Sequence, residues 1–348
     1  MNLQLTFKKR LTIDETRYYN EMVLDNPYGS IYQSTHWVDI HSPEYTDKIF
    51  FWDGERPDLV AGVLLIHKKH ILRFAEIKFG PVVKDLSRLV EIVDSLVAYT
   101  KRHFHWLKIS LPYPISNETE ILERMSLKKH NMKFDLNGSN WSTLVIKLDR
   151  SLDEIFQSFR QSHKRYVKKA RTIFQVRLAK DEKDLRNFAK VYNDMWLQRG
   201  YKQNCNLIIE RICCLGEFLR TTQKGFVYLV YNDSDLVGGT IFIRSGRRLI
   251  YLIGASAPQW RKDPVTYLAF WLAIQDAHTL EGVDIFDLGG YNIFVGKEDQ
   301  VYNINHFKYG FSKCLEFFPK TQYYVFSPLH YFLYKNPSAT LGLHPKDF

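Results

Sequence analysis

Cysteine is scarce in this sequence, with four residues among 348: Cys205, Cys213, Cys214 and Cys314. They form no C-x-x-C pair with a matching second half, so neither a zinc ribbon nor a disulfide framework is indicated. The histidine pairs in HKKH (67–70) and HFH (103–105) suit surface positions better than a metal site, and we expect no metal. The scarcity favours a reducing, cytoplasmic compartment.

Long apolar runs are also missing. No uninterrupted run approaches the ~20 residues of a membrane-spanning helix, and the start, MNLQLTFKKRLTIDE, lacks the apolar segment of a secretory signal. With 45% hydrophobic and 25% charged residues, the chain has the composition of a globular protein, and it is long enough for two domains. The sequence therefore predicts a soluble protein.

Acidic residues are outnumbered, with 38 Asp and Glu against 48 Lys and Arg, which gives a formal net charge of +10. This excess favours an anionic partner such as nucleic acid, a phosphate or an anionic lipid. Many soluble proteins are simply basic, so the charge alone does not select a function.

An internal duplication is visible in the sequence. LVAGVLLI at 59–66 and LVGGTIFI at 236–243 lie 177 positions apart. The same offset carries Asp85, where a helical pattern begins, to Lys262, next to the start of a second helical pattern, and carries the apolar run WLKISL (106–111) onto VDIFDL (283–288). Three elements that share one offset predict two copies of one fold.

Each copy has the same order of predicted elements: a strand, two helices, three antiparallel strands, a helix and closing strands. In the second copy the meander is predicted at 225–231, 236–243 and 248–254, after helices at 182–201 and 206–222. This order predicts an α/β protein with mixed sheets. We place the domains at 1–148 and 149–348, separated by a charged helix that begins near 151. WSTLVIKL (141–148) is expected to finish the first sheet, and QYYVFSPLHYFLY (322–334) to pack on the second or to contact a membrane surface peripherally.

Six short motifs follow one another along the chain. They are NPYGSIYQSTHW with Gln33, Ser34 and Trp37, FGPVV (79–83), SFRQSHKRYVKKA (158–170), LIYLIGAS (249–256), DLGG (287–290) and HFKYGF (306–311). In this order they resemble the Fem family of peptidyltransferases, which are tandem proteins of the GCN5-related N-acyltransferase (GNAT) fold. The resemblance implies transfer of an amino acid from aminoacyl-tRNA to an amine of a peptidoglycan precursor, a peptide or an amino sugar. The chain lacks the long helical hairpin that some members insert in the second domain.

One stretch of sequence bears on the identity of the acyl donor. It is SAPQWRKDP (256–264), which lies before the second predicted central helix. GNAT enzymes that use coenzyme A hold its pyrophosphate on backbone amides of a glycine-rich turn there, and this stretch has no glycine. We therefore expect no cofactor. Arg261 and Lys262 could still bind a phosphate, so N-acylation dependent on coenzyme A or a carrier remains an alternative. The second alternative is a non-catalytic nucleic-acid-binding protein.

Basic side chains gather in QSHKRYVKKAR at 161–171. The candidates for phosphate contacts with tRNA or a nucleotide-linked acceptor are Lys164, Arg165, Lys168 and Lys169. On one helix these side chains, with His163, cover most of the surface, so a solvated helix fits the pattern equally well.

The reaction centre is expected around HFKYGF. The resemblance places Lys308, beside Phe307, at the point of chemistry, where its charge would stabilise the oxyanion formed when an amine attacks an ester carbonyl. A lysine at a strand edge is the structural alternative. Asp287 is a candidate general base, although we favour its satisfying the backbone of the glycine turn.

Further residues are candidate substrate contacts. Those implied by the resemblance or by position are Gln33, Trp37, Arg199, Tyr201, Tyr251, Gly289 and Gly290. Tyr251 could equally pack in the core, and Arg199 with Gly200 could end a helix.

Overall fold

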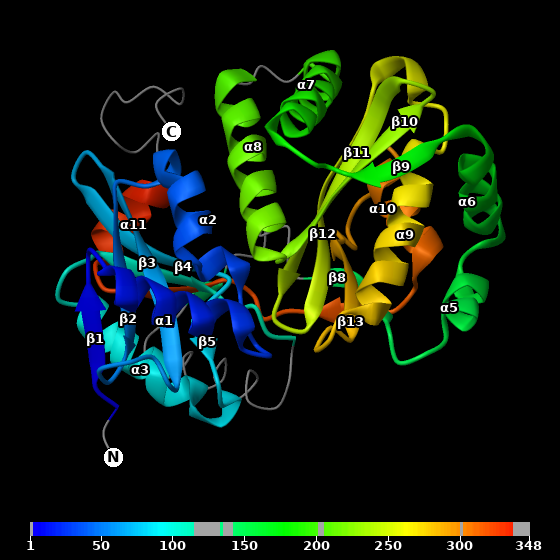
Figure 1. Ribbon diagram of the computed structural model, residues 1–348. Coiled ribbons are helices and arrows are strands. Elements are labelled where there is room, and N and C mark those ends of the chain that lie inside the picture. The colour runs from blue at the N-terminus through cyan, green and yellow to red at the C-terminus, as the bar shows by residue number, and fades with distance from the viewer. Residues whose placement is uncertain (1–2, 115–132, 135–141, 201–204, 300–301, 337–348) are drawn as a thin grey trace. The chain divides into compact units, whose positions relative to one another are not determined.

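The computed structural model describes residues 3–114, 133–134, 142–200, 205–299 and 302–336. The chain divides into two compact units, Met1–Trp141 with Phe317–Phe348, and Ser142–Glu316. Each unit is built on one mixed sheet flanked by helices (Figure 1). The predicted α/β class with mixed sheets is confirmed.

The sheet of the first unit has the strand order β1-β2-β3-β4-β6-β15-β7, with β5 paired to β3. Its strands are β1 (Leu5–Lys8), β2 (Asp47–Asp53), β3 (Val60–Lys69), β4 (Leu72–Lys78), β5 (Val82–Val83), β6 (Trp106–Ser110), β7 (Lys133–Phe134) and β15 (Gln322–Val325). Its helices are α1 (Ile13–Asp25), α2 (Thr35–Ile40), α3 (Leu89–Thr100) and α11 (Pro328–Lys335), with short 3-10 helices at Ile31–Gln33, Ser42–Glu44 and Leu86–Arg88.

The sheet of the second unit has the order β14-β8-β13-β12-β11-β10-β9. Its strands are β8 (Ser142–Lys147), β9 (Gln175–Leu178), β10 (Gly225–Asn232), β11 (Asp235–Ser245), β12 (Arg248–Ser256), β13 (Ile285–Gly290) and β14 (Leu315–Phe317). Its helices are α5 (Leu152–Ser158), α6 (Gln161–Ile173), α7 (Glu182–Gln198), α8 (Cys205–Thr222), α9 (Val265–Thr279) and α10 (Tyr302–Phe311), with a 3-10 helix at Pro258–Trp260.

The central helix of each unit buries an apolar face against its sheet. Leu89, Val93, Leu96 and Val97 of α3 are all buried, as their spacing predicts. The carboxylate of Asp85 accepts from the Ser87 amide at 2.9 Å and so begins the short 3-10 turn that leads into α3. In the second unit α9 covers one face of the sheet, while α7 and α8 cover the other (Figure 1).

The two sheets repeat one topology, which confirms the tandem arrangement. Reading outward from β1 and from β9, both begin with four antiparallel strands, β1-β2-β3-β4 and β9-β10-β11-β12. A central helix then connects to a parallel strand, β6 in one and β13 in the other.

The sixth strand of each sheet comes from an unexpected part of the chain. β8 pairs antiparallel with β13 of the second sheet, and β15, near the C-terminus, pairs antiparallel with β6 of the first. The prediction that WSTLVIKL finishes the first sheet is therefore wrong, and so is the packing of the tail on the second sheet. β8 and β15 occupy equivalent positions, so the two copies exchange one strand.

The predicted boundaries change for the same reason. The second unit begins at Ser142, not 149, and the chain beyond Glu316 belongs to the first unit. The single charged helix predicted from 151 is in fact two helices, because Phe159 and Arg160 take extended backbone angles between α5 and α6. Across the described residues, no helix combines the length and apolarity needed to cross a bilayer.

Candidate active site

In the second unit the hydrogen-bonded ladder between two parallel strands ends early, and this end of the ladder, which we call the opening, marks the candidate site. β12 and β13 pair over 248–250 and 285–287, and beyond these residues the ladder ends. In the first unit the equivalent strands, β4 and β6, pair over 74–78 and 106–110. Their contact continues beyond this ladder, because the Gly80 amide donates to the Ser110 carbonyl oxygen at 3.0 Å. The opening is thus a feature of the second sheet.

A β-bulge in β12 lies at this opening. Ile241 of β11 pairs with Ile253 and Phe242 pairs with Tyr251, so Leu252 is the extra residue. A bulge bends its strand and often re-aims neighbouring side chains beside an active site. Tyr251, predicted on this strand, directly follows the last β12 residue that pairs with β13 and directly precedes the bulge residue.

Lys308 reaches the opening from α10, so the strand-edge alternative for this lysine is wrong. The Lys308 side chain is buried, with the residue 7% exposed. Its Nζ donates to the carbonyl oxygens of Gly290 at 2.7 Å and Gly289 at 3.2 Å. It also lies 5.7 Å from the centre of the Tyr251 ring. One ammonium is thereby held where the two strands separate.

Burial lowers the pKa of Lys308 to about 8, and the nearby Asp287 carboxylate partly opposes this by raising it. The side chain is therefore largely charged at neutral pH and loses its charge as the pH rises through about 8. A cation with little water around it interacts strongly with a developing negative charge.

Asp287 is a structural member of the site. One carboxylate oxygen accepts from the Gly289 amide at 2.8 Å and from the Thr143 hydroxyl, and the other accepts from Arg248 at 3.1 Å. Arg248 in turn donates to Glu316 at 2.6 Å. With both oxygens engaged, Asp287 fixes the glycine turn, the interpretation favoured from the sequence.

The glycine turn brings β13 close to β12. Gly289 has φ +70°, and a Cβ at this position would stand 2.6 Å from the Tyr251 carbonyl oxygen. A side chain would be strained there and would also push the strands apart. Gly289, Gly290, Tyr251 and Lys308 therefore lie together, and their role at a reaction centre stays a prediction.

Other predicted residues of the second unit have mixed outcomes. Arg199 ends α7, with its guanidinium 5.2 Å from the centre of the Trp196 ring. Burial raises the pKa of Tyr251, and the positive charge of Arg199 partly opposes this rise. The two side chains are therefore close enough for their charges to interact. The Phe307 ring packs against Phe270 at 5.0 Å, and we assign it to packing. Tyr201 lies outside the described residues.

Gln33 and Trp37 are core residues of the first unit, and their prediction as substrate contacts is wrong. The fully buried Gln33 amide accepts from the Val63 amide at 2.8 Å and donates to the Lys78 carbonyl at 2.6 Å. It therefore joins β3 to the end of β4. Trp37 is 8% exposed and stacks on His41 at 4.2 Å.

The basic segment forms α6 and presents its cations on one side. Arg165, Lys168 and Lys169 are exposed, and Lys164 is half-buried and donates to Gln157. His163, counted among the surface cations from the sequence, is instead 2% exposed. The signal for this was its spacing with the buried Val167 and Ala170, on the inner face of the helix.

The residues before α9 use several of their backbone amides within their own turn. The backbone amides of 260, 261, 263, 265 and 267 donate to carbonyl oxygens of this same turn. The Trp260 ring packs against Phe174 at 5.6 Å, which holds the turn in place. Five amides of this turn are therefore already engaged, which disfavours the cradle of free amides that a pyrophosphate needs.

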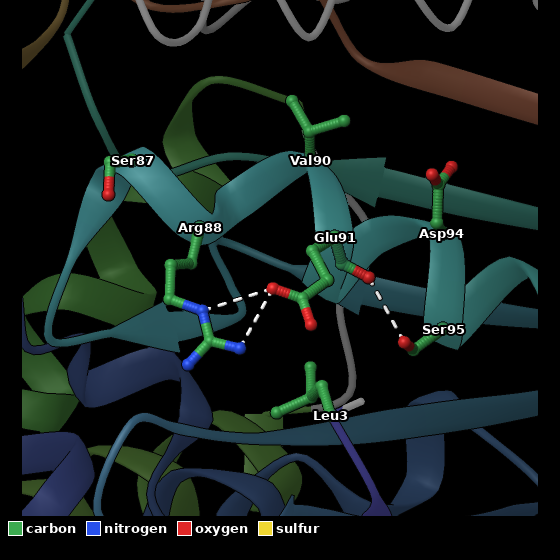
Figure 2. A pocket seen from close by; sticks show the side chains of 7 residues that line it. All are labelled: Leu3, Ser87, Arg88, Val90, Glu91, Asp94 and Ser95. Carbon is green, nitrogen blue, oxygen red and sulfur yellow. Dashed lines mark hydrogen bonds and ion pairs between the residues drawn. The ribbon is translucent and has the colours of Figure 1, made fainter. Parts of the chain in front are cut away.

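A cavity of about 610 Å³ in the first unit has no part in this site. Figure 2 shows its seven lining residues, Leu3, Ser87, Arg88, Val90, Glu91, Asp94 and Ser95. Arg88 donates to Glu91 at 2.8 Å, so its charge is already matched. Among the described residues, no group of three or more histidine, cysteine or acidic side chains could hold a metal ion.

Comparison with known proteins defines the class of fold. Residues 157–308, which include α10 and Lys308, match the family model described as an acetyltransferase (GNAT) domain. In a search by sequence, no curated protein matches the chain. Together with the repeated topology, the match defines a tandem GNAT fold.

Solved structures place this fold more narrowly. The chain is similar to FemX, with a TM-score of 0.78 at 16% identity over 95% of this chain and 99% of FemX. It is also similar to a conserved protein of unknown function from Bacteroides thetaiotaomicron, with a TM-score of 0.61 at 9% identity, covering 92% of this chain and 100% of that one. A third is the C-terminal domain of a putative lysylphosphatidylglycerol synthetase from Agrobacterium fabrum, with a TM-score of 0.55 at 11% identity, covering 94% and 96%. The chain therefore has a tandem GNAT fold similar to that of FemX.

Proposed function

We propose that the protein is an aminoacyltransferase that moves an amino acid from aminoacyl-tRNA to an amine of a peptidoglycan precursor, a peptide or an amino sugar, in the cytoplasm. The observation that carries the proposal is the buried Lys308 ammonium, held by Gly289 and Gly290 where β12 and β13 separate. The fold similarity to FemX supports the same class of reaction.

The reaction joins the acceptor nitrogen to the carbonyl carbon of the aminoacyl ester and breaks the bond from that carbon to the tRNA ribose oxygen. In the intermediate the former carbonyl oxygen carries a negative charge, which the Lys308 ammonium stabilises. The proton lost by the attacking nitrogen balances the proton gained by the leaving ribose oxygen. Aminolysis of an activated ester needs positioning and charge stabilisation more than a catalytic triad.

The exposed cations of α6 support tRNA as the donor. Arg165, Lys168 and Lys169 lie in the same unit as Lys308 and could contact phosphates along one side of the helix. The turn before α9, in which five backbone amides are already bonded, argues against coenzyme A as an alternative donor.

The test follows a labelled amino acid from charged tRNA to candidate acceptors, with and without ribonuclease. Transfer that ribonuclease abolishes supports the proposal. Thiol release from an acyl-coenzyme A without tRNA would instead establish the alternative N-acyltransferase. Binding of nucleic acid with no transfer from either donor would favour the non-catalytic alternative.

A further inference from the structure

A buried histidine joins the basic helix to the helix that carries Lys308. His163 of α6 is 2% exposed, and its Nε2–H donates to the Phe307 carbonyl oxygen at 2.9 Å. Phe307 immediately precedes Lys308 in α10. The imidazole therefore fixes the backbone at the residue next to the ammonium.

The space for this ring is made by a glycine inside α10. A Cβ on Gly310 would stand 2.0 Å from the His163 ring carbon Cε1 and 2.1 Å from Nε2. Glycine weakens a helix relative to alanine, so its place here is explained by the close approach of the imidazole. The ring also contacts Phe311 edge-on at 4.9 Å and Tyr267 at 5.0 Å.

Two further contacts join the same parts of α6 and α10. The Arg160 amide donates to the Gly310 carbonyl oxygen at 2.8 Å, and its guanidinium donates to His306 Nε2 at 2.7 Å. These contacts surround the hydrogen bond of His163 and keep α10 in one position. The packing of Phe307 and Phe311 on Phe270 and the hydrogen bonds of Lys308 also hold α10 in place.

We propose that His163 is a positioning residue, which sets the place of Lys308 in the opening between β12 and β13 through its hydrogen bond to Phe307. The inference rests on the proposed function for its catalytic consequence. Its structural consequence, the environment of the Lys308 amine, can be measured whether or not the protein transfers an amino acid. Burial lowers the pKa of His163, so the ring is neutral at physiological pH and acts by donation, not by charge.

The variants separate the hydrogen bond from the volume of the ring. His163→Phe fills the space without a donor, whereas His163→Gln keeps an N–H near the position of Nε2. Gly310→Ala displaces the ring by a different route. His278→Phe is the matched control, because His278 Nε2 also lies 2.9 Å from a backbone carbonyl oxygen in the same unit, that of Arg150.

The experiment measures competitive labelling of each lysine by acetic anhydride across pH, read by mass spectrometry, together with single-turnover transfer and thermal melting. We expect Lys308 in His163→Phe and Gly310→Ala to titrate closer to the usual lysine value, with kcat about tenfold to hundredfold lower and KM unchanged. His163→Gln and His278→Phe should retain the wild-type values. Folded His163→Phe and Gly310→Ala variants with wild-type Lys308 labelling would overturn the inference. If Lys308 labelling changes as expected but no variant or wild-type protein transfers, the positioning stands and the proposed function fails.

Discussion

Asp287 and Lys308 are joined through one glycine turn: the Asp287 carboxylate accepts from the Gly289 amide at 2.8 Å, and the Lys308 ammonium donates to the Gly289 carbonyl oxygen at 3.2 Å. The two charges also interact directly, because the carboxylate raises the pKa that burial lowers. Asp287 therefore helps to place Lys308 through the Gly289 turn, and its negative charge favours the charged form of the amine.

Asp287→Asn keeps an oxygen that can accept from Gly289 but removes the negative charge. We expect the pKa of Lys308 to fall below about 8, because the group that raises it is gone. The decline of the transfer rate at high pH should therefore begin at a lower pH. The control is Glu316→Gln, which removes a carboxylate bonded to Arg248. An identical pH profile for Asp287→Asn and wild type would contradict this coupling.

The role of Lys308 predicts the shape of the pH profile. An oxyanion-stabilising ammonium loses its charge as the pH rises through about 8, so the single-turnover rate should fall there. In Lys308→Arg the cation persists at high pH, and the fall should disappear even if the rate is lower throughout. A wild-type rate that rises through about pH 8 would indicate a neutral, proton-accepting Lys308.

Burial of this charge should weaken the folded protein. The pKa of Lys308 is about 8 when folded and is 10.5 as the ordinary value, so the unfolded chain binds more protons between these limits and stability rises with pH across them. At pH 7, Lys308→Met should be more stable than wild type by ~2 kcal/mol. Chemical denaturation should show this difference shrinking as the pH approaches 10. A constant difference would show that burying the ammonium carries no desolvation cost.

Gly289 should tolerate no side chain. Gly289→Ala adds a Cβ 2.6 Å from the Tyr251 carbonyl oxygen at a residue with φ +70°. Gly200→Ala is the matched control, since Gly200 has φ +83° and nothing within 4 Å of a Cβ. We expect the control to lose ~1–2 kcal/mol from its backbone angles alone, and Gly289→Ala to lose more and to lose transfer activity. Equal melting temperatures for the two variants would contradict the close approach of the strands.

The exposed cations of α6 should govern the salt dependence of tRNA binding. Arg165→Glu with Lys168→Glu should weaken binding and flatten the slope of log affinity against log salt by about 0.7–0.9 for each phosphate that is no longer neutralised. Lys101→Glu with Arg102→Glu, at exposed positions of the first unit, is the control. If both pairs of substitutions reduce the slope equally, the effect belongs to net charge and not to α6.

Much of the fold was predictable because its signals are local. The strands around LVAGVLLI and LVGGTIFI and the buried face of α3 follow from apolar periodicity, and a shared offset revealed the repeat. The exchange of β8 and β15 was not predictable in this way, because each is a short apolar strand that fits the same position in either sheet. The sheet that each strand joins depends on its packing against residues that are far away in the sequence.

Prediction of the candidate site was limited in the same way, because the contacts of its residues are not visible in the sequence. Motifs singled out its glycines, Tyr251 and Lys308, which the structure brings together. The aromatic composition of HFKYGF concealed a helix, for which the four-residue spacing of Phe307 and Phe311 was the available signal. Gln33 was misassigned because a sequence does not show that both ends of an amide are bonded to backbone. Gln33→Leu should accordingly lower stability by ~1–3 kcal/mol and leave kcat unchanged, while Gln4→Leu, at an exposed position, should change neither.

The measurement that tests the central claim most directly is the single-turnover rate of amino acid transfer from charged tRNA by wild type and Lys308→Ala at pH 7, with tRNA binding and thermal melting measured in parallel. We expect the variant to fold and to bind tRNA as wild type does, and to transfer ~10²–10³-fold more slowly, the usual loss when one oxyanion-stabilising group is removed. A folded variant that transfers within a few-fold of the wild-type rate would contradict the account.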